Sequence, residues 1–122
     1  MIQRFTDLRV WQGAHVLVLD IYKATKDFPK EEIFGLTSQM RRAAVSVTSN
    51  IAEGFVRQTK SDKINFYTIA LASLSELRSQ MLIARDLEYS SRDSYFLMEK
   101  KAETVSQMLT GLIRTAPSRV RS

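Results

Sequence analysis

The sequence of 122 residues is 44% hydrophobic and 25% charged, which is typical of one globular domain spanning residues 1–122. It contains no cysteine, which excludes disulfides and thiolate metal sites and favours a reducing, cytoplasmic location. Arg4 and Asp7 stand where a signal peptide needs an apolar stretch, and no apolar run is long enough for a membrane span. The formal net charge of +5 favours an anionic partner such as nucleic acid, but many basic proteins have no such partner.

Two segments in the first half of the chain carry apolar residues at the spacing of an amphipathic helix. The first helix is predicted over residues 8–26, with Asp7 as its candidate N-cap. The second is predicted over residues 32–55, and a break near Gly35 is an alternative. Gly54 is a candidate C-cap, because glycine adopts the left-handed conformation that often ends a helix.

The second half of the chain repeats this spacing. The third helix is predicted over residues 61–87, with Ser61 as its candidate N-cap, and the fourth over residues 91–114. Glycine and proline are scarce, four and two respectively, and the connections between the four segments are short. The sequence therefore predicts an all-α fold, an antiparallel up-down-up-down four-helix bundle.

The predicted helices have more apolar surface than one bundle needs to bury. On the third helix Ile69, Ile83 and Leu87 lie outside the main apolar stripe, and on the first helix Val16 and Leu19 do the same. Exposed apolar patches usually mark an interface, and a symmetric homo-oligomer is the commonest form. We therefore expect self-association; the alternative is a scatter of ordinary surface side chains.

Two arginines, Arg78 and Arg85, fall within the main apolar stripe of the predicted third helix. A charge in that position must snorkel, pair with an acid or lie at an interface. Glu53 and Glu76 are candidate partners for such pairs. We favour such structural pairing and also include both arginines in the expected oligomer interface; the alternative is anion binding in a basic groove.

The sequence offers little for catalysis. His15 is the single histidine, and neither a nucleophile motif nor a phosphate-binding glycine motif is present. Glu99 and Glu103 share a face of the predicted fourth helix, but no histidine joins them as a di-iron site would require. We therefore expect a protein that is no enzyme, with no catalytic residue, metal, cofactor or small-molecule substrate.

Basic residues are densest on and after the predicted second helix. The candidate phosphate contacts, which would hold nucleic acid, are Arg41, Arg42, Arg57, Lys60 and Lys63, with Arg119 and Arg121 in the tail. The same side chains could instead form a solvated face or a hydrogen-bonded interface with another subunit. No aromatic residues interleave with these bases, so stacking on single-stranded bases is not indicated.

Several stretches resemble one known family. They are FTDLRVWQ (5–12), FPKEE with FGL (28–36), QMRRAAVSV (39–47), SNIAEG (49–54) and ASLSEL (72–77). They resemble the four-helix-bundle proteins encoded in intervening sequences of large-subunit ribosomal RNA genes, over about residues 5–89. Two positions depart from the family pattern: Thr48 stands where proline is frequent, and Glu88 stands where glycine before tyrosine is usual.

The resemblance implies fold and assembly more than activity. It implies an antiparallel four-helix bundle that forms a ring-shaped homopentamer. A related group, the accessory determinants of diversity-generating retroelements, is similar in fold and binds nucleic acid and a reverse transcriptase through a basic surface. By this analogy one hypothesis is an oligomer that binds RNA or DNA, and the alternative is an oligomeric scaffold for a protein partner.

Overall fold

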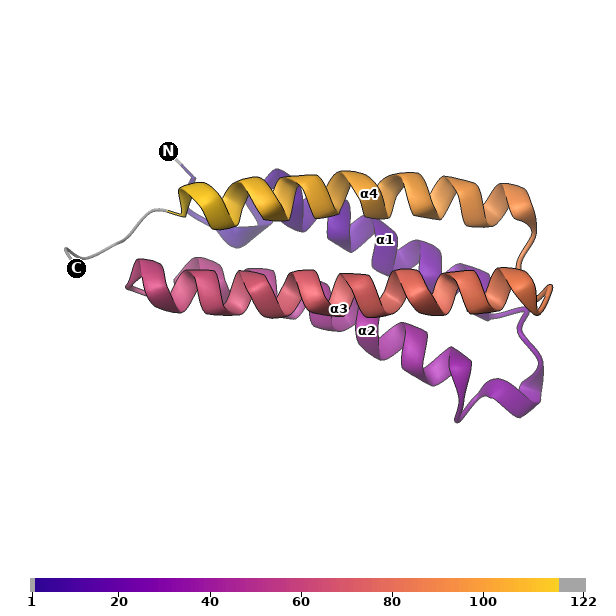
Figure 1. Ribbon diagram of the computed structural model, residues 1–122. Helices are drawn as coiled ribbons and strands as arrows, with labels where there is room; N and C mark the ends of the chain where they lie inside the picture. Colours follow the sequence, from indigo (N-terminus) through magenta and orange to yellow (C-terminus); the bar gives the residue numbers. More distant parts are fainter. Residues whose placement is uncertain (1, 117–122) are drawn as a thin grey trace.

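The chain folds into four long helices in the computed structural model, which describes residues 2–116 (Figure 1). The helices are α1 (Arg9–Thr25), α2 (Leu36–Val56), α3 (Lys60–Asp86) and α4 (Arg92–Thr115). Two short 3₁₀ helices, η1 (Phe5–Asp7) and η2 (Lys30–Glu32), precede α1 and α2. Within residues 2–116 there is no strand, and no helix is long and apolar enough to cross a membrane. The prediction of an all-α chain with four helices is confirmed.

Three predicted helices begin and end within one residue of the observed ones, but the second does not. Its predicted start is residue 32, whereas α2 begins at Leu36. The residues before it form η2 and a turn, and Gly35 is the N-cap with φ −117° and ψ −116°. The alternative of a break near Gly35 is therefore the correct one.

Two of the predicted N-cap residues are wrong by one or two positions. The hydroxyl of Thr59, not of Ser61, accepts the N–H of Asp62 at 3.1 Å and caps α3. Leu8, not Asp7, is the N-cap of α1, and its side chain makes no capping bond. Hydroxyl caps satisfy backbone N–H groups that the first helical turn leaves without partners.

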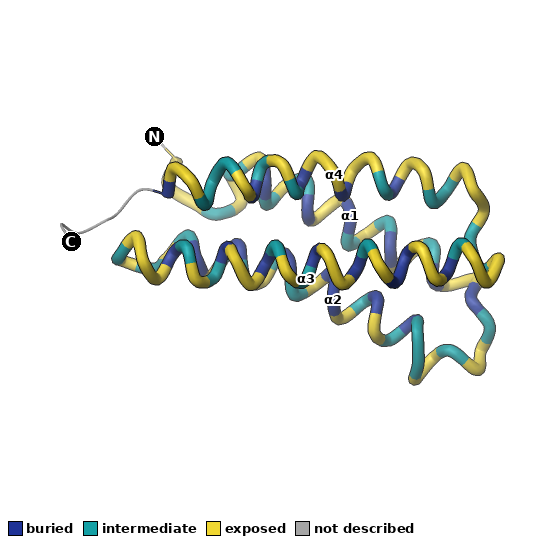
Figure 2. The backbone as a smooth tube through the Cα atoms, in the orientation of Figure 1, coloured by how far each residue is buried: buried dark blue, intermediate teal, exposed yellow. Residues whose placement is uncertain are grey.

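The apolar stripes of the four helices meet in one core (Figure 2). Each helix contacts two others: α1 contacts α2 and α4, and α3 contacts α2 and α4. Burying one large apolar side chain stabilises the fold by about 1.5–3 kcal/mol, so the stripes drive the packing. The deeply buried side chains come from all four helices and include Leu17, Ile21, Met40, Ile51, Leu74, Leu77, Val105 and Leu109.

Gly54 lies inside α2 and is not its C-cap, which corrects the prediction. A Cβ atom at this position would lie 2.6 Å from Cε1 and 2.8 Å from Cδ1 of Tyr67 on α3. Tyr67 is itself only 1% exposed. Gly54 is therefore needed for the close approach of α2 and α3, because any larger residue would overlap a ring that cannot move into solvent.

The turn between α3 and α4 is built around Glu88. Among residues 2–116 it is the one non-glycine residue with a positive φ, 63°. The N–H of Glu88 donates to the carbonyl of Arg85, and the N–H of Tyr89 donates to the carbonyl of Ala84, both at 2.9 Å. This is the Schellman pattern that ends helices at a left-handed residue, usually glycine.

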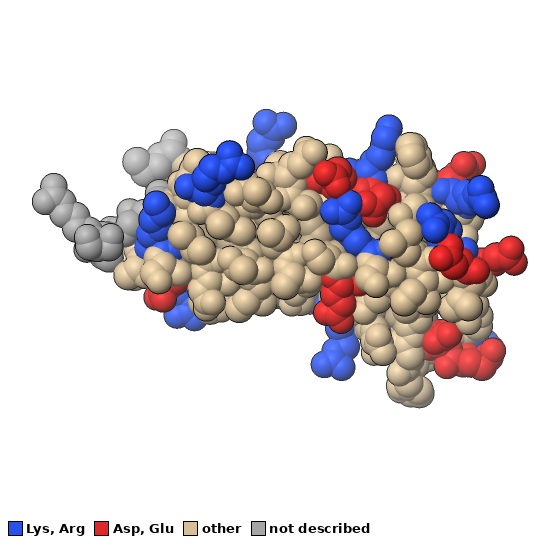
Figure 3. All heavy atoms as spheres, viewed as in Figure 1, with Lys and Arg blue, Asp and Glu red and all other residues tan. Residues whose placement is uncertain are grey.

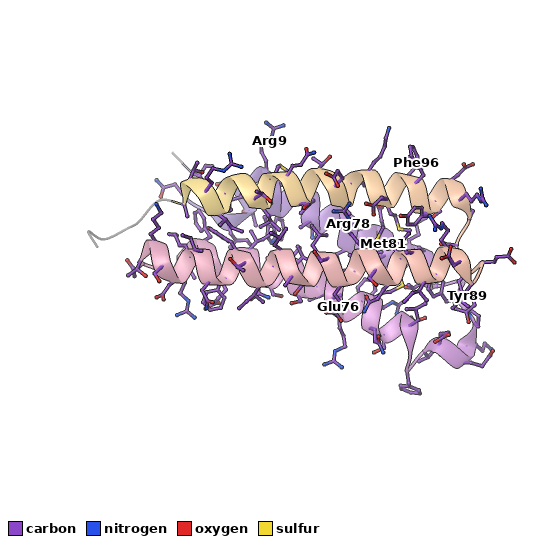
Figure 4. All side chains as sticks on the ribbon, viewed as in Figure 1. Arg9, Glu76, Arg78, Met81, Tyr89 and Phe96 are labelled. Carbon is purple, nitrogen blue, oxygen red and sulfur yellow. The ribbon has the colours of Figure 1, made fainter. Side chains whose placement is uncertain are left out.

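Glu32 ties this turn to the start of α2. Its Oε1 accepts the backbone N–H of Leu36 at 3.0 Å, and its Oε2 accepts the hydroxyl of Tyr89 at 3.0 Å. Tyr89 lies beside the α1–α2 connection at the end of the molecule opposite the termini (Figure 4). The bond to Glu32 raises the pKa of Tyr89, because ionised tyrosine could no longer donate to the carboxylate.

Candidate functional site

The basic residues predicted to bind nucleic acid do not form one patch. Arg41 and Arg42 lie near the start of α2, whereas Arg57 and Lys60 lie at the turn between α2 and α3. At 1.5 Å per residue, the helix separates the two groups by about 22 Å. Arg119 and Arg121 lie outside the described residues.

Two arginines of the predicted set already have partners in their own chain. Arg41 donates from Nε to the hydroxyl of Thr25 at 2.9 Å, and its guanidinium lies 4.6 Å from the ring centre of Tyr22. Arg57 pairs with Glu53 at 2.5 Å. By contrast, Arg42 and Lys60 are exposed and make no ion pair within residues 2–116.

Lys63 is not a surface residue, which corrects its assignment as a candidate phosphate contact. It is 2% exposed, and its ammonium donates to the carbonyls of Gly54 at 3.2 Å and Phe55 at 2.7 Å. These are carbonyls of the last turn of α2, which leaves such groups without helical partners. Lys63 therefore stabilises the end of α2.

The five apolar residues expected at the oligomer interface are all at the surface. Their exposed fractions lie between 41% and 55% for Val16, Leu19, Ile69, Ile83 and Leu87. The structure exposes further large apolar side chains that are outside the expected interface set. Phe34 is the extreme case at 96%, and others include Ile33, Val45, Val56, Phe96 and Leu97. Figure 4 shows Phe96 pointing away from the bundle.

Arg78 pairs within the chain, between α3 and α4 (Figure 4). It donates from Nε to Glu99 at 2.9 Å and from Nη2 to Glu103 at 2.7 Å, and the bond to Glu99 raises its pKa most. The candidate partners Glu53 and Glu76 are wrong, since Glu53 pairs with Arg57 and Glu76 accepts from Gln80. Arg78 therefore fastens α4 to α3 in a single chain.

Arg85, the other arginine expected at the interface, is half-buried against α4. Its Nε donates to Asp86 at 3.0 Å, and its guanidinium lies 4.8 Å from the ring centre of Tyr95. Both arginines of the expected interface thus have partners in their own chain. The apolar members of that set are left to carry any contact with another subunit.

Charged residues are distributed unevenly over the surface. Figure 3 shows acidic and basic side chains mixed at the end that holds the α3–α4 turn, and mainly basic ones at the end with the termini. A broad uncharged stretch lies between them over α3 and α4. Three helices contain long runs without any charged residue, at positions 43–52, 64–75 and 104–113.

The described residues contain no cluster of three or more His, Asp or Glu that could hold a metal ion. His15 is exposed and stacks on Trp11, with ring centres 4.8 Å apart. The side chain is therefore explained by packing on a neighbour in α1. The candidate functional sites are therefore surfaces, some apolar and some basic.

Fold and surfaces together define an all-α protein whose four helices pack as in a four-helix bundle. The family model described as 23S rRNA-intervening sequence protein matches residues 6–111, and the chain belongs to this family. The prediction from the sequence motifs is thereby confirmed.

A solved structure has the same fold: a protein of unknown function from the S23 ribosomal protein family of Bacteroides thetaiotaomicron. The two chains are 22% identical, and the match covers 87% of this chain and 96% of the other with a TM-score of 0.80. No curated protein matches the sequence. Family and fold are therefore established, and the surfaces of the bundle are the features that bear on its function.

Proposed function

We propose that the chain is a non-enzymatic scaffold that works as a homo-oligomer of antiparallel, up-down-up-down bundles. The observation that carries this proposal is the combination of charge-free runs with exposed apolar side chains. Ile69 lies in the run of α3 and Val45 in that of α2, and both are about 40% exposed. Charged residues are depleted in the core of protein interfaces relative to the rest of a surface, as they are here.

Other large apolar side chains are exposed as well, more than a monomer needs. Phe34, at 96% exposure, has almost its whole ring in solvent. Burying one aromatic side chain removes about 150–250 Å² from water, so a ring left outside is a strong candidate anchor for a second subunit. A standard interface of about 800 Å² per partner would need several such residues.

The number of subunits rests on the family resemblance, which implies five. A pentamer of 14.0 kDa chains would have a mass of about 70 kDa. Light scattering coupled to size exclusion measures this mass directly. A single 14.0 kDa species at micromolar concentration would refute self-association.

A charge placed in the uncharged surface should break the assembly before it unfolds the bundle. We expect Ile69→Lys to reduce the mass while the helical circular dichroism stays unchanged, because a desolvated charge costs several kcal/mol at an interface and little in water. Ser61→Lys, an exposed position in the first turn of α3 that is outside the charge-free run and about two turns from Ile69, is the matched control and should keep the oligomer. Equal loss of helicity and assembly in Ile69→Lys would count against the proposed surface.

A second candidate function, RNA binding, is favoured by the basic end of the molecule. Arg4, Arg9, Arg57, Lys60 and Arg114 belong to segments at the end that carries the termini (Figures 1 and 3). The acidic residues of these segments are fewer, namely Asp7, Glu53 and Asp62. In an oligomer this end would repeat once per subunit, and repeated weak contacts add avidity.

RNA binding would be tested by fluorescence anisotropy of a labelled RNA across a salt series. Removing one basic side chain that touches a phosphate should reduce the slope of log affinity against log salt by about 0.7 for single strands. The double variant Lys60→Ala, Arg114→Ala should therefore lower the slope by about 1.4. Affinity that does not fall with salt would refute RNA as the partner and leave the scaffold role.

A further inference from the structure

The connection between α1 and α2 lies at the end of the molecule opposite the termini (Figure 1). Residues of this connection and of the two helices line a hollow. Its volume is about 650 Å³, within the usual range for small-ligand pockets. The walls come from the last turn of α1, from η2 and from the first two turns of α2. All of these segments belong to one chain, so the hollow does not depend on assembly.

Four cationic side chains line this hollow: Lys26, Lys30, Arg41 and Arg42. No carboxylate lines it. The acids of the wall segments, Asp27, Glu31 and Glu32, are not among its lining residues. Glu32 uses its two oxygens to accept from Leu36 and Tyr89. The hollow therefore concentrates positive charge in a concave site, where the field is stronger than on a flat surface.

Arg41 is held in place by the hollow's own wall. Besides the bond from Nε to Thr25, its Nη2 donates to the carbonyl of Tyr22 at 3.3 Å. The described residues give its Nη1 no partner. A guanidinium fixed by two bonds has lost its rotamer freedom before a ligand arrives, so less entropy is lost on binding.

The start of α2 adds neutral donors to the residues that line the hollow. Thr37 lines the hollow, is only 6% exposed, and its hydroxyl has no hydrogen-bond partner within residues 2–116. The backbone N–H groups of Thr37 and Ser38 are also without partners there, because Gly35 offers no capping side chain. A buried hydroxyl without a partner destabilises the free protein, and a bound acceptor would recover that cost.

From this convergence we propose that the hollow binds a phosphoryl group, as inorganic phosphate or as the terminal monoester of a nucleotide or a nucleic acid strand. At neutral pH a monoester carries about −1.5 to −2 charges and three acceptor oxygens, which match four cations and the donors at the helix start. A carboxylate carries a single charge and would compensate the cations less. The inference goes beyond the proposed function, because it requires neither assembly nor an RNA partner.

Calorimetry with inorganic phosphate, AMP and acetate tests the site on the full chain, and phosphorus NMR follows the binding of the first two. Phosphate and AMP should bind at least about tenfold more tightly than acetate, a difference of about 1.4 kcal/mol. Arg42→Ala should weaken phosphate about tenfold, as expected for loss of a charge-assisted hydrogen bond. Arg9→Ala removes the same charge at the opposite end of the molecule and should change phosphate affinity less than about twofold.

Thr37→Val separates binding from folding. Without ligand its melting temperature should stay the same or rise, because valine removes a hydroxyl that has no partner. Its phosphate affinity should fall about fivefold, the size of one neutral hydrogen bond, and Thr37→Ser should retain it. No detectable binding up to roughly 10 mM phosphate, or binding that both Thr37→Val and Arg42→Ala leave unchanged, would overturn the proposal.

Two oligonucleotides distinguish the sources of the phosphoryl group and keep this inference apart from RNA binding. A strand with a terminal phosphate should outbind the same strand with a terminal hydroxyl, and Arg42→Ala should abolish the difference. If RNA does not bind but phosphate and AMP do, the site stands with a small-molecule ligand. If RNA binds, but inorganic phosphate and AMP do not and the terminal phosphate of the strand adds no affinity, the site is refuted while RNA binding survives.

Discussion

Gly54 offers the sharpest test of how the bundle is packed. In Gly54→Ala the new methyl group would lie 2.6 Å from a ring carbon of Tyr67, closer than packed carbon atoms approach. Because that ring is 1% exposed, it cannot move into water, so α2 and α3 must separate. Such overpacking costs about 1–3 kcal/mol, against about 0.5–1 kcal/mol gained by replacing glycine with alanine in a helix.

Gly111→Ala provides a matched control in α4. Its Cβ would meet no atom within 4 Å, so only the gain in helix propensity applies, about 0.5–1 kcal/mol. The difference between the two free energies of unfolding, about 1–3 kcal/mol, then isolates the contact with Tyr67. Urea unfolding followed by circular dichroism measures both, at one protein concentration because association would shift the midpoint.

The double variant Gly54→Ala, Tyr67→Leu tests whether overlap with the Tyr67 ring causes the destabilisation. Leucine lacks the ring atoms that the methyl group would overlap, so the two changes should be non-additive by at least about 0.5 kcal/mol. Gly54→Ala as stable as Gly111→Ala would refute the reasoning. Additive costs in the double variant would show that the clash is not with Tyr67.

Three further predictions concern single side chains. Glu88→Gly should raise the free energy of unfolding by about 0.5–1 kcal/mol in urea, because glycine avoids the strain of a positive φ but loses more chain entropy. Lys63→Met should lower it by about 1–3 kcal/mol, because the last carbonyls of α2 lose a donor, and RNA affinity should not change. The pKa of Tyr89 is raised in the folded protein, so the bond to Glu32 stabilises fully below the ordinary tyrosine value of about 10 and is lost as pH rises through the folded value. Tyrosinate absorbance should show Glu32→Gln lowering this pKa, and an unchanged titration would contradict the bond.

The helices could be predicted from the sequence because apolar spacing and scarce glycine and proline leave few other folds. The start of α2 could not, since Glu31 and Glu32 look like the acidic first turn of a helix. The structure uses Glu32 differently, as an acceptor for the N–H of Leu36 four residues later. The spacing of apolar residues does not predict such a hydrogen bond between a side chain and the backbone of a turn.

The burial of Lys63 and the partners of Arg78 could both have been predicted from the sequence. Lys63 lies four residues before the buried Tyr67, so the reasoning that placed Arg78 in the apolar stripe would have placed Lys63 there too. The partners of Arg78 could also be found. It precedes the α3–α4 turn by about as many residues as Glu99 and Glu103 follow it, and pairing across the turn would have selected them.

The phosphoryl site was missed for a reason that applies to any long helix. The density of basic residues along the sequence placed Arg42, Arg57 and Lys60 in one predicted site. A helix of 21 residues, however, spreads its side chains over about 30 Å. The chain reversal between α1 and α2 instead brings Lys26 and Lys30 to Arg42. Charge convergence in a helical protein is therefore decided where the connections fold back, and the basic residues to compare are those on either side of a turn.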